Sequence, residues 1–248
     1  MTRGLGRVDF YRHLKGQFKR VIGEREFSGE AVKIISARTL AVKEAIGEPE
    51  RKDYPLMRGK EFMMEADFRG AKGQAFTDMP ANYEGSLADV LSLDLSDNAQ
   101  RAVFVASLNA VMRYAGLASG TVHCRDHEPG LCAQQLVTHI RDRYPRPKVA
   151  LIGYQPAMAD SLSKAFPLRI VDLDADNIGK ERAGVIVDDP AATPEVIAWC
   201  DVILSTGSTA VNGTIGHFLN DKPVIFFGVT VAGIAALCGL NRYCPFGH

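Results

Sequence analysis

Apolar positions recur along this chain at periods that differ between segments, and each period predicts an element. In residues 8–22 apolar side chains recur every three or four positions, which predicts an amphipathic helix. Residues 61–78 form two extended runs around the glycine-containing stretch 69–73, which predicts a β-hairpin. Residues 96–116 begin with a capping residue, continue with apolar helical spacing and stop at a glycine. We therefore expect a long, buried helix there.

The second half of the chain alternates short apolar runs with helical stretches. Strands that alternate with helices predict parallel βαβ units, and strands that are apolar throughout predict a sheet covered on both faces. We therefore expect an α/β protein in which an N-terminal α+β domain, residues 1–118, precedes a Rossmann-like, doubly wound parallel sheet domain, residues 119–248. The predicted strands are 148–153, 168–174, 201–207 and 222–228, with a short extended piece at 183–189, and the predicted helices are 156–166, 194–200, 208–220 and 230–240.

Charge and composition exclude several classes of protein. The chain has 29 basic and 29 acidic residues, which argues against a protein that binds nucleic acid through general electrostatic attraction. Its apolar runs are shorter than the roughly 20 residues of a membrane span, and its first residues lack the apolar core of a secretory signal. We expect a cytoplasmic protein with no membrane partner. The oligomeric state stays open, a homo-oligomer included.

Polar residues and glycines gather where the predicted strands end. In an open parallel sheet, ligands bind beyond the carboxyl ends of the strands, near the point where the strand order reverses. The segment STGSTAVNGT combines hydroxyl groups with a glycine where a strand leads into a helix, and free N–H groups there suit a phosphate or carboxylate. A well-capped helix in a tight turn explains the same residues. The candidate ligand residues are Gly153, Gln155, Thr206, Gly207, Ser208, Thr209, Asn212 and Thr214.

The first predicted strand is not followed by a dinucleotide fingerprint. The segment GYQPAM lacks the G-x-G-x-x-G spacing, and Pro156 removes a backbone donor. We therefore do not expect NAD. In the N-terminal half, Thr77 follows a strand and can reach a cleft. Asn109 is a polar residue in an otherwise apolar helix, so it is either an internal clamp or a residue that lines an interdomain cleft.

The densest group of reactive side chains is GTVHCRDHEPGLCAQQL, residues 120–136. His123, Cys124, His127 and Cys132 are common ligands of zinc and other borderline metals, although the spacing is not that of a zinc finger. A helix that starts near Pro129 would place Cys132 in its first turn, where the helix dipole lowers a thiol pKa. Cys244, near the C-terminus, offers a further ligand. The alternative is that these cysteines fill the core and the histidines are solvated.

Taken together, several of these segments resemble one known family. KGQAFTD, ASLNAVMR, KVALIGYQP, DVILSTGSTAVNGTI and KPVIFFGVT occur in this order, and they resemble the putative heavy-metal-chelation family from about residue 55 to the end of the chain. The resemblance implies a domain like the enolase N-terminal domain, followed by a Rossmann-like domain, with the site in the cleft between them. The stretches HCRDHEPGLCA and NRYCPFG resemble one branch of that family, whereas many other members lack them and continue further at the C-terminus.

Three functions follow as hypotheses. The first is a protein that binds a transition or heavy metal, or a metal-linked cofactor, in the interdomain cleft through Cys124, Cys132 and Cys244, with His123 or His127 assisting. The second is a metal-independent enzyme that acts on a small anionic or nucleotide-like substrate. The third is a ligand-sensing module without catalysis, since the chain shows neither a Ser-His-Asp pattern nor a paired-carboxylate pattern. All three imply a small-molecule or metal ligand, and only the second requires an enzyme.

Overall fold

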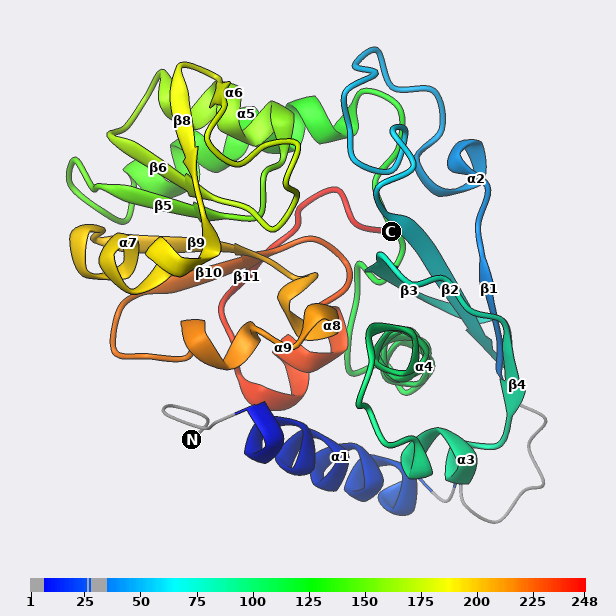
Figure 1. Ribbon diagram of the computed structural model, residues 1–248. Helices are drawn as coiled ribbons and strands as arrows, with labels where there is room; N and C mark the ends of the chain where they lie inside the picture. Colours follow the sequence, from blue (N-terminus) through cyan, green and yellow to red (C-terminus); the bar gives the residue numbers. More distant parts are fainter. Residues whose placement is uncertain (1–6, 26, 28–34) are drawn as a thin grey trace.

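The computed structural model describes residues 7–25, 27 and 35–248, and it contains two β-sheets with a long helix between them (Figure 1). The first sheet is antiparallel, with the strand order β3-β2-β1-β4. Its strands are β1 (Ile35–Thr39), β2 (Phe62–Phe68), β3 (Ala71–Thr77) and β4 (Tyr83–Gly85), and the helices nearby are α2 (Val42–Ile46) and α3 (Leu87–Ser92).

The predicted hairpin is present, but its turn is shorter than the glycine pattern suggested. Arg69 and Gly70 alone connect β2 to β3, and both have positive φ angles, 54° and 84°. Two successive residues with positive φ suit the twist of the flanking strands. Gly73 lies inside β3 instead of in the turn. A Cβ atom there would lie 2.2 Å from the backbone nitrogen of Ala110, so this glycine lets the strand pack directly against a helix backbone.

That helix is α4 (Asn98–Tyr114), and it confirms the long buried helix expected from the sequence. The Asp97 carboxylate accepts a hydrogen bond from the backbone N–H of Gln100 and caps its first turn. Every residue of α4 from 101 to 112 is buried, because the antiparallel sheet covers one side and helices of the second half cover the other. Helix α1 (Arg7–Glu24) packs alongside, with the Phe18 and Phe104 rings 5.8 Å apart.

The second sheet has the strand order β11-β10-β9-β5-β6-β8-β7, and its strands are parallel except for β7. Its strands are β5 (Val149–Ile152), β6 (Leu168–Val171), β7 (Glu181–Arg182), β8 (Val185–Asp188), β9 (Val202–Thr206), β10 (Val224–Phe227) and β11 (Arg242–Tyr243). Its helices are α5 (Glu128–Arg141), α6 (Pro156–Ser163), α7 (Thr193–Trp199), α8 (Thr209–Asn212) and α9 (Ala232–Cys238), with short 3₁₀ turns at Pro190–Ala192 and Ile215–Phe218.

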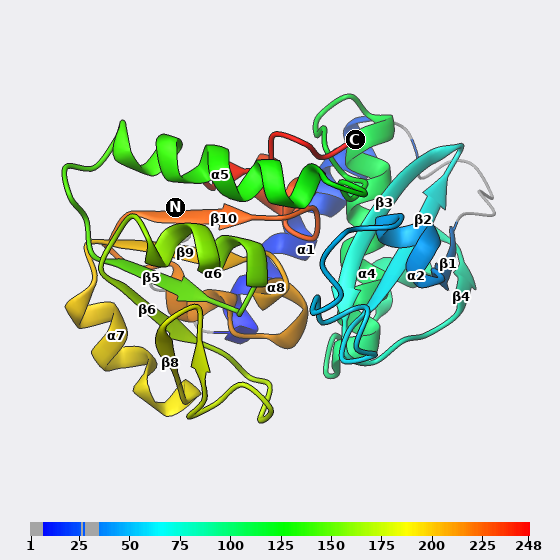
Figure 2. The same cartoon turned by 90° about the horizontal axis from the view of Figure 1, so that it is seen from above.

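Helices cover both faces of this sheet, as the apolar strands predicted. Successive side chains of a strand point to opposite faces. Leu151 accordingly packs into the core beneath α5 and α6, whereas Ile152 packs into the core shared with α7, α8 and α9 (Figures 1 and 2). The α/β fold class is therefore confirmed as an antiparallel sheet followed by a mostly parallel sheet. The likeness of the first part to the enolase N-terminal domain, and a boundary at residue 118, stay predictions.

Two details of the second half differ from the expectation. The helix predicted at 208–220 is broken, because Gly213 adopts a left-handed conformation with φ 84° and ends α8 after four residues. Strand β11 was not predicted, since two residues carry too little pattern to be recognised. It matters because it adds the last residues of the chain to the edge of the sheet. No helix among residues 7–25 and 35–248 has the length and apolar character needed to cross a membrane.

Candidate ligand cavity and thiol cluster

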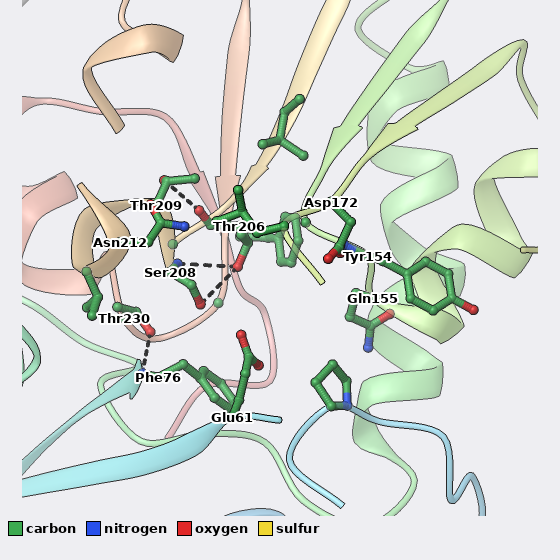
Figure 3. Close-up of a pocket in the computed structure, with 18 of the residues that line it drawn as sticks. Glu61, Phe76, Tyr154, Gln155, Asp172, Thr206, Ser208, Thr209, Asn212 and Thr230 are labelled. Atoms are coloured by element: carbon green, nitrogen blue, oxygen red, sulfur yellow. Dashed lines mark hydrogen bonds between the residues drawn. The ribbon is translucent and has the colours of Figure 1, made fainter. Parts of the chain in front are cut away.

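A cavity of about 880 Å³ lies where the carboxyl ends of β5, β6, β9 and β10 face the antiparallel sheet (Figure 3). The order of the parallel sheet reverses between β5 and β9, so the cavity is at the place where such folds bind ligands. Gly153, at the end of β5, has φ 86°, and a Cβ atom there would lie 2.5 Å from Cγ2 of Thr206 at the end of β9. A glycine is therefore required where these two strand ends meet.

Most of the ligand residues predicted from the sequence line this cavity. They are Thr77, Gly153, Gln155, Thr206, Gly207, Ser208, Thr209, Asn212 and Thr214. Thr77 comes from the end of β3, across the cavity from the others, so both sheets contribute to the lining. Gln155 caps α6, because its side-chain oxygen accepts a hydrogen bond from the backbone N–H of Met158 at 2.6 Å.

The hydroxyl groups after β9 are largely engaged with their own loop. The backbone N–H of Ser208 donates to Oγ1 of Thr206, and the Thr209 hydroxyl donates to the Thr206 carbonyl at 2.8 Å. Asn212 Oδ1 accepts hydrogen bonds from both the backbone N–H and the hydroxyl of Thr214. These contacts fit the alternative that the sequence left open, in which the segment is a capped turn. Helix α8 has only four residues, so its dipole contributes little to the binding of an anion.

Asn109 lies outside the cavity lining and acts as an internal clamp. It is fully buried in α4, and its Nδ2 group donates to the carbonyl oxygens of Gln74, Val229 and Thr230 at 2.9, 3.2 and 3.0 Å. Its Oδ1 atom accepts from the backbone N–H of Gly233 at 2.7 Å. All of its polar atoms are therefore used to join the two sheets through α4, which fits the internal clamp, one of the two roles that the sequence left open.

Cys124, Cys132 and Cys244 come from three separate segments, and all three line the cavity. The C-terminal segment is held beside residues 119–124, because the backbones of Val122 and His248 exchange hydrogen bonds of 2.9 and 2.8 Å. Arg242 also donates to the carbonyl oxygens of Ser119 and Gly120. These contacts bring Cys244 close enough to the other two thiols to affect their protonation.

Cys124 and Cys132 are held in the protonated form, whereas the helix dipole was expected to lower the pKa of Cys132. Helix α5 begins at Glu128, so Cys132 lies in its second turn. Burial, and then the neighbouring Cys244, raise the pKa of Cys132 to about 12. Burial also raises the pKa of Cys124, with smaller contributions from Cys244 and Cys132. Loss of solvation therefore outweighs any effect of the dipole on these buried thiols.

The two histidines of the same segment lie in different environments. His123 lines the cavity, packs edge-on against Phe76 at 5.3 Å and approaches the Cys124 carbonyl with Nδ1 at 2.5 Å. That contact places the proton on Nδ1, and burial lowers the pKa of His123 to about 4, so Nε2 keeps a free lone pair. His127 is exposed and lies outside the cavity lining, so the structure does not bring it together with the other predicted metal ligands.

The thiols and the imidazole of the cavity are donor types that suit a soft metal ion, but they are not arranged around a single point as the ligands of a metal site are. Thiols and an imidazole are the ligands that such ions prefer. Within the described part of the chain, however, no three His, Cys, Asp or Glu side chains are arranged to hold one ion.

The most strongly perturbed carboxyl group of the cavity, Glu61, carries no recognisable signal in the sequence. Glu61 directly precedes β2 and points into the cavity toward the strand ends that carry Thr206 and Ser208 (Figure 3). Glu61 is partly buried and lines the cavity. Burial, and then the nearby carboxyl groups of Asp172, Asp78 and Asp174, raise the pKa of Glu61 to about 7.

Residues 135–241 match the model of the DUF364 family, described as "Putative heavy-metal chelation". A DUF364 protein of unknown function from Pyrococcus horikoshii is 16% identical, with 69% of each chain covered and a TM-score of 0.48. Another, from Desulfitobacterium hafniense, is 14% identical over 72% of this chain and 73% of its own, also with a TM-score of 0.48.

A probable ornithine cyclodeaminase from Bordetella pertussis is 14% identical over 91% of this chain and 64% of its own, with a TM-score of 0.29. Among curated proteins no match is found. The family expected from the sequence motifs is confirmed where its model matches. The similarity of this chain to the DUF364 family, described as putative heavy-metal chelation, thus rests on residues 135–241.

Proposed function

We propose that this protein binds a soft or borderline metal ion, free or carried by a small molecule, at the thiol end of the cavity. The observation that carries the proposal is the meeting of Cys124, Cys132 and Cys244, which are separated in sequence, on the wall of one cavity. If these cysteines only filled the hydrophobic core, nothing would require three of them, from three segments, to line the same cavity. The family description, putative heavy-metal chelation, supports the same class of ligand.

Binding requires the thiols to lose protons and to turn. Only the thiolate is a metal ligand, and burial keeps Cys124 and Cys132 protonated in the absence of a cation. A nearby metal charge lowers the pKa of a coordinating thiol, so each thiol that becomes a ligand releases its proton. The thiol side chains must also change rotamer, because no three ligands are yet arranged around one point in the described chain. His123 has Nε2 available as a further ligand.

Metal titration of the chelator-free protein tests this proposal. We expect Cd²⁺ and Zn²⁺ to bind with release of protons and to raise the melting temperature, and Mg²⁺ to do neither, because thiolates prefer soft ions. Cys124→Ala and Cys244→Ala should each weaken Cd²⁺ binding at least about tenfold, because even loss of a hydrogen-bond partner of a metal ligand costs about that much. Cys238→Ala is the matched control, since this partly buried cysteine lies outside the cavity lining.

Two results would contradict the proposal. One is Cd²⁺ uptake that stays unchanged in both cavity variants. The other is a loss of uptake in Cys238→Ala as large as in Cys124→Ala, which would assign the binding to general thiol content. Circular dichroism of each variant shows whether it has folded, and Cys244→Ser offers a less disruptive replacement if Cys244→Ala has not.

A further inference from the structure

The cavity has a second end with a different chemistry, formed by carboxyl groups. Glu61 and Asp78 lie on the side of the antiparallel sheet, and Asp172 and Asp174 follow β6 on the opposite side. Among the described residues that line the cavity, Lys60 is the one lysine or arginine, and it pairs with Asp174 and Asp176. The uncompensated charge at this end is therefore negative, which disfavours an anionic ligand there.

Most of these carboxyl groups have partners in the protein. Asp172 accepts hydrogen bonds from the backbone N–H groups of Tyr154 and Asp174. Asp78 accepts from the Asn98 amide at 2.7 Å. The Glu61 carboxyl group has neither a hydrogen bond nor an ion pair to any other described residue, although it lies in a confined site. An ionised carboxyl group without partners is costly in a partly desolvated site, and a ligand that supplies donors would reduce that cost.

Apolar and aromatic side chains also line this cavity, including Phe76, Phe227 and Val171. A ligand that fills this space needs an apolar body with a positively charged nitrogen at one end. A planar amidine or guanidine would suit it best, because its two N–H groups match the two oxygens of a carboxylate. A compact divalent ion suits it less, since no three carboxyl side chains in the described chain are arranged to hold one.

We propose that the cavity binds an organic cation, with an amidinium, guanidinium or ammonium group paired to Glu61 and an apolar body against the strand ends of the parallel sheet. This site goes beyond the thiol end of the same cavity and does not depend on a metal. If a small molecule carries the metal ion into the cavity, its cationic nitrogen would lie at Glu61 and its metal ion at the thiols.

Pairing with a cation must ionise Glu61, so binding depends on pH in a defined direction. With a pKa of about 7, Glu61 is largely protonated at about pH 6 and largely ionised at about pH 8. Asp78, Asp172 and Asp174 face it from the two sides and Lys60 lies beside them. An amidine keeps its charge over this range, so its affinity should rise roughly fivefold to tenfold between these pH values as Glu61 loses its proton.

Benzamidine, benzamide and benzoate are matched probes, since they share the ring and differ in charge. By isothermal titration at about pH 8, we expect benzamidine to bind at least about tenfold more tightly than benzamide, and benzoate to bind more weakly still. Glu61→Gln should remove the preference for benzamidine and its pH dependence. Glu84→Gln, at an exposed glutamate of β4, is the control and should change neither.

Three outcomes would overturn the inference. They are equal binding of benzamidine and benzamide, tighter binding of benzoate, and a preference for benzamidine that survives in Glu61→Gln. Lack of binding by all three probes counts against it as well. If Glu61→Gln does not fold, the pH dependence of the unaltered protein decides. A variant with Cys124 and Cys244 replaced by serine should keep the preference, so failure of the metal proposal and failure of this inference can be told apart.

Discussion

Replacing Asn109 with leucine should weaken the connection between the two sheets. The leucine side chain has a similar volume but cannot form the four hydrogen bonds of the amide. The largest loss is at Gly233, whose N–H lies in the first turn of α9, where the helix itself supplies no partner. An unsatisfied buried donor costs about 1–3 kcal/mol. The three carbonyl groups lose a partner each, but carbonyl groups tolerate this better.

We therefore expect Asn109→Leu to lower the free energy of unfolding by about 3 kcal/mol. Urea titration measures this, with the fluorescence of Trp199, the single tryptophan, as one probe and far-ultraviolet circular dichroism as the other. With a denaturant dependence of about 3 kcal/mol per M, the midpoint should fall by about 1 M. Asn241→Leu is the matched control, because Asn241 is exposed and its side chain makes no hydrogen bond within the described structure.

The two probes also test the coupling itself. Trp199 lies in α7 on the parallel sheet, whereas circular dichroism reports both sheets. If Asn109 joins the two parts, both transitions should move together. A midpoint shift below about 0.3 M, which is under about 1 kcal/mol, would refute the role of the clamp. A shift equal to that of Asn241→Leu would refute it equally.

Three further predictions concern packing and protonation. Gly73→Ala should lower the free energy of unfolding by about 2 kcal/mol or more, because the added Cβ would collide with the backbone of α4. Gly16→Ala is the control, since open space surrounds Gly16 in α1 and no loss of stability is expected there. Melting curves of the two variants test the difference. Above about pH 7, Glu61→Gln should have a free energy of unfolding about 1–2 kcal/mol higher than that of the unaltered protein, and near pH 4 the two should be equal. Urea titrations at both pH values measure this difference. The pKa of Glu61 is about 7 in the folded protein and an ordinary 4.5 in the unfolded chain, so the folded protein loses stability as the pH rises toward and through 7. A stability difference between the two proteins that is the same at both pH values would contradict this. Cys132, with a pKa of about 12, should react with iodoacetamide at about pH 8 far more slowly in the folded protein than in urea. Mass spectrometry of the labelled peptide measures both rates, and equal rates would contradict the prediction.

The periodicity of the sequence determined the secondary elements that positioned the site. The apolar strands before Gly153 and Thr206 are typical of a parallel sheet with helices on both faces, and the carboxyl ends of parallel strands meet at one edge. Residues on those ends could therefore be named as cavity lining from the sequence alone. Thr77 followed from the same reasoning, since it ends a strand of the predicted hairpin.

Only the tertiary structure decided which predicted residues work together. Whether Cys244 meets Cys124 depends on the pairing of β11 with β10 and on the pairing of Val122 with His248. The second contact joins residues more than a hundred positions apart in the sequence. No local pattern encodes such a pairing. The same limit explains why Asn109 could not be assigned as clamp or ligand in advance, because the answer lies in the four partners that surround it.

Protonation states were beyond the sequence for the same physical reason. A glutamate before a strand, or a cysteine near a helix start, has an ordinary pKa until its surroundings remove water or add charge. Glu61 faces three other carboxyl groups because two sheets meet across the cavity, and Cys132 is buried because α5 packs on the parallel sheet. The sequence by itself determined the elements and the residue types available, whereas burial and long-range contacts determined their charge, their partners and hence the chemistry that the cavity can offer.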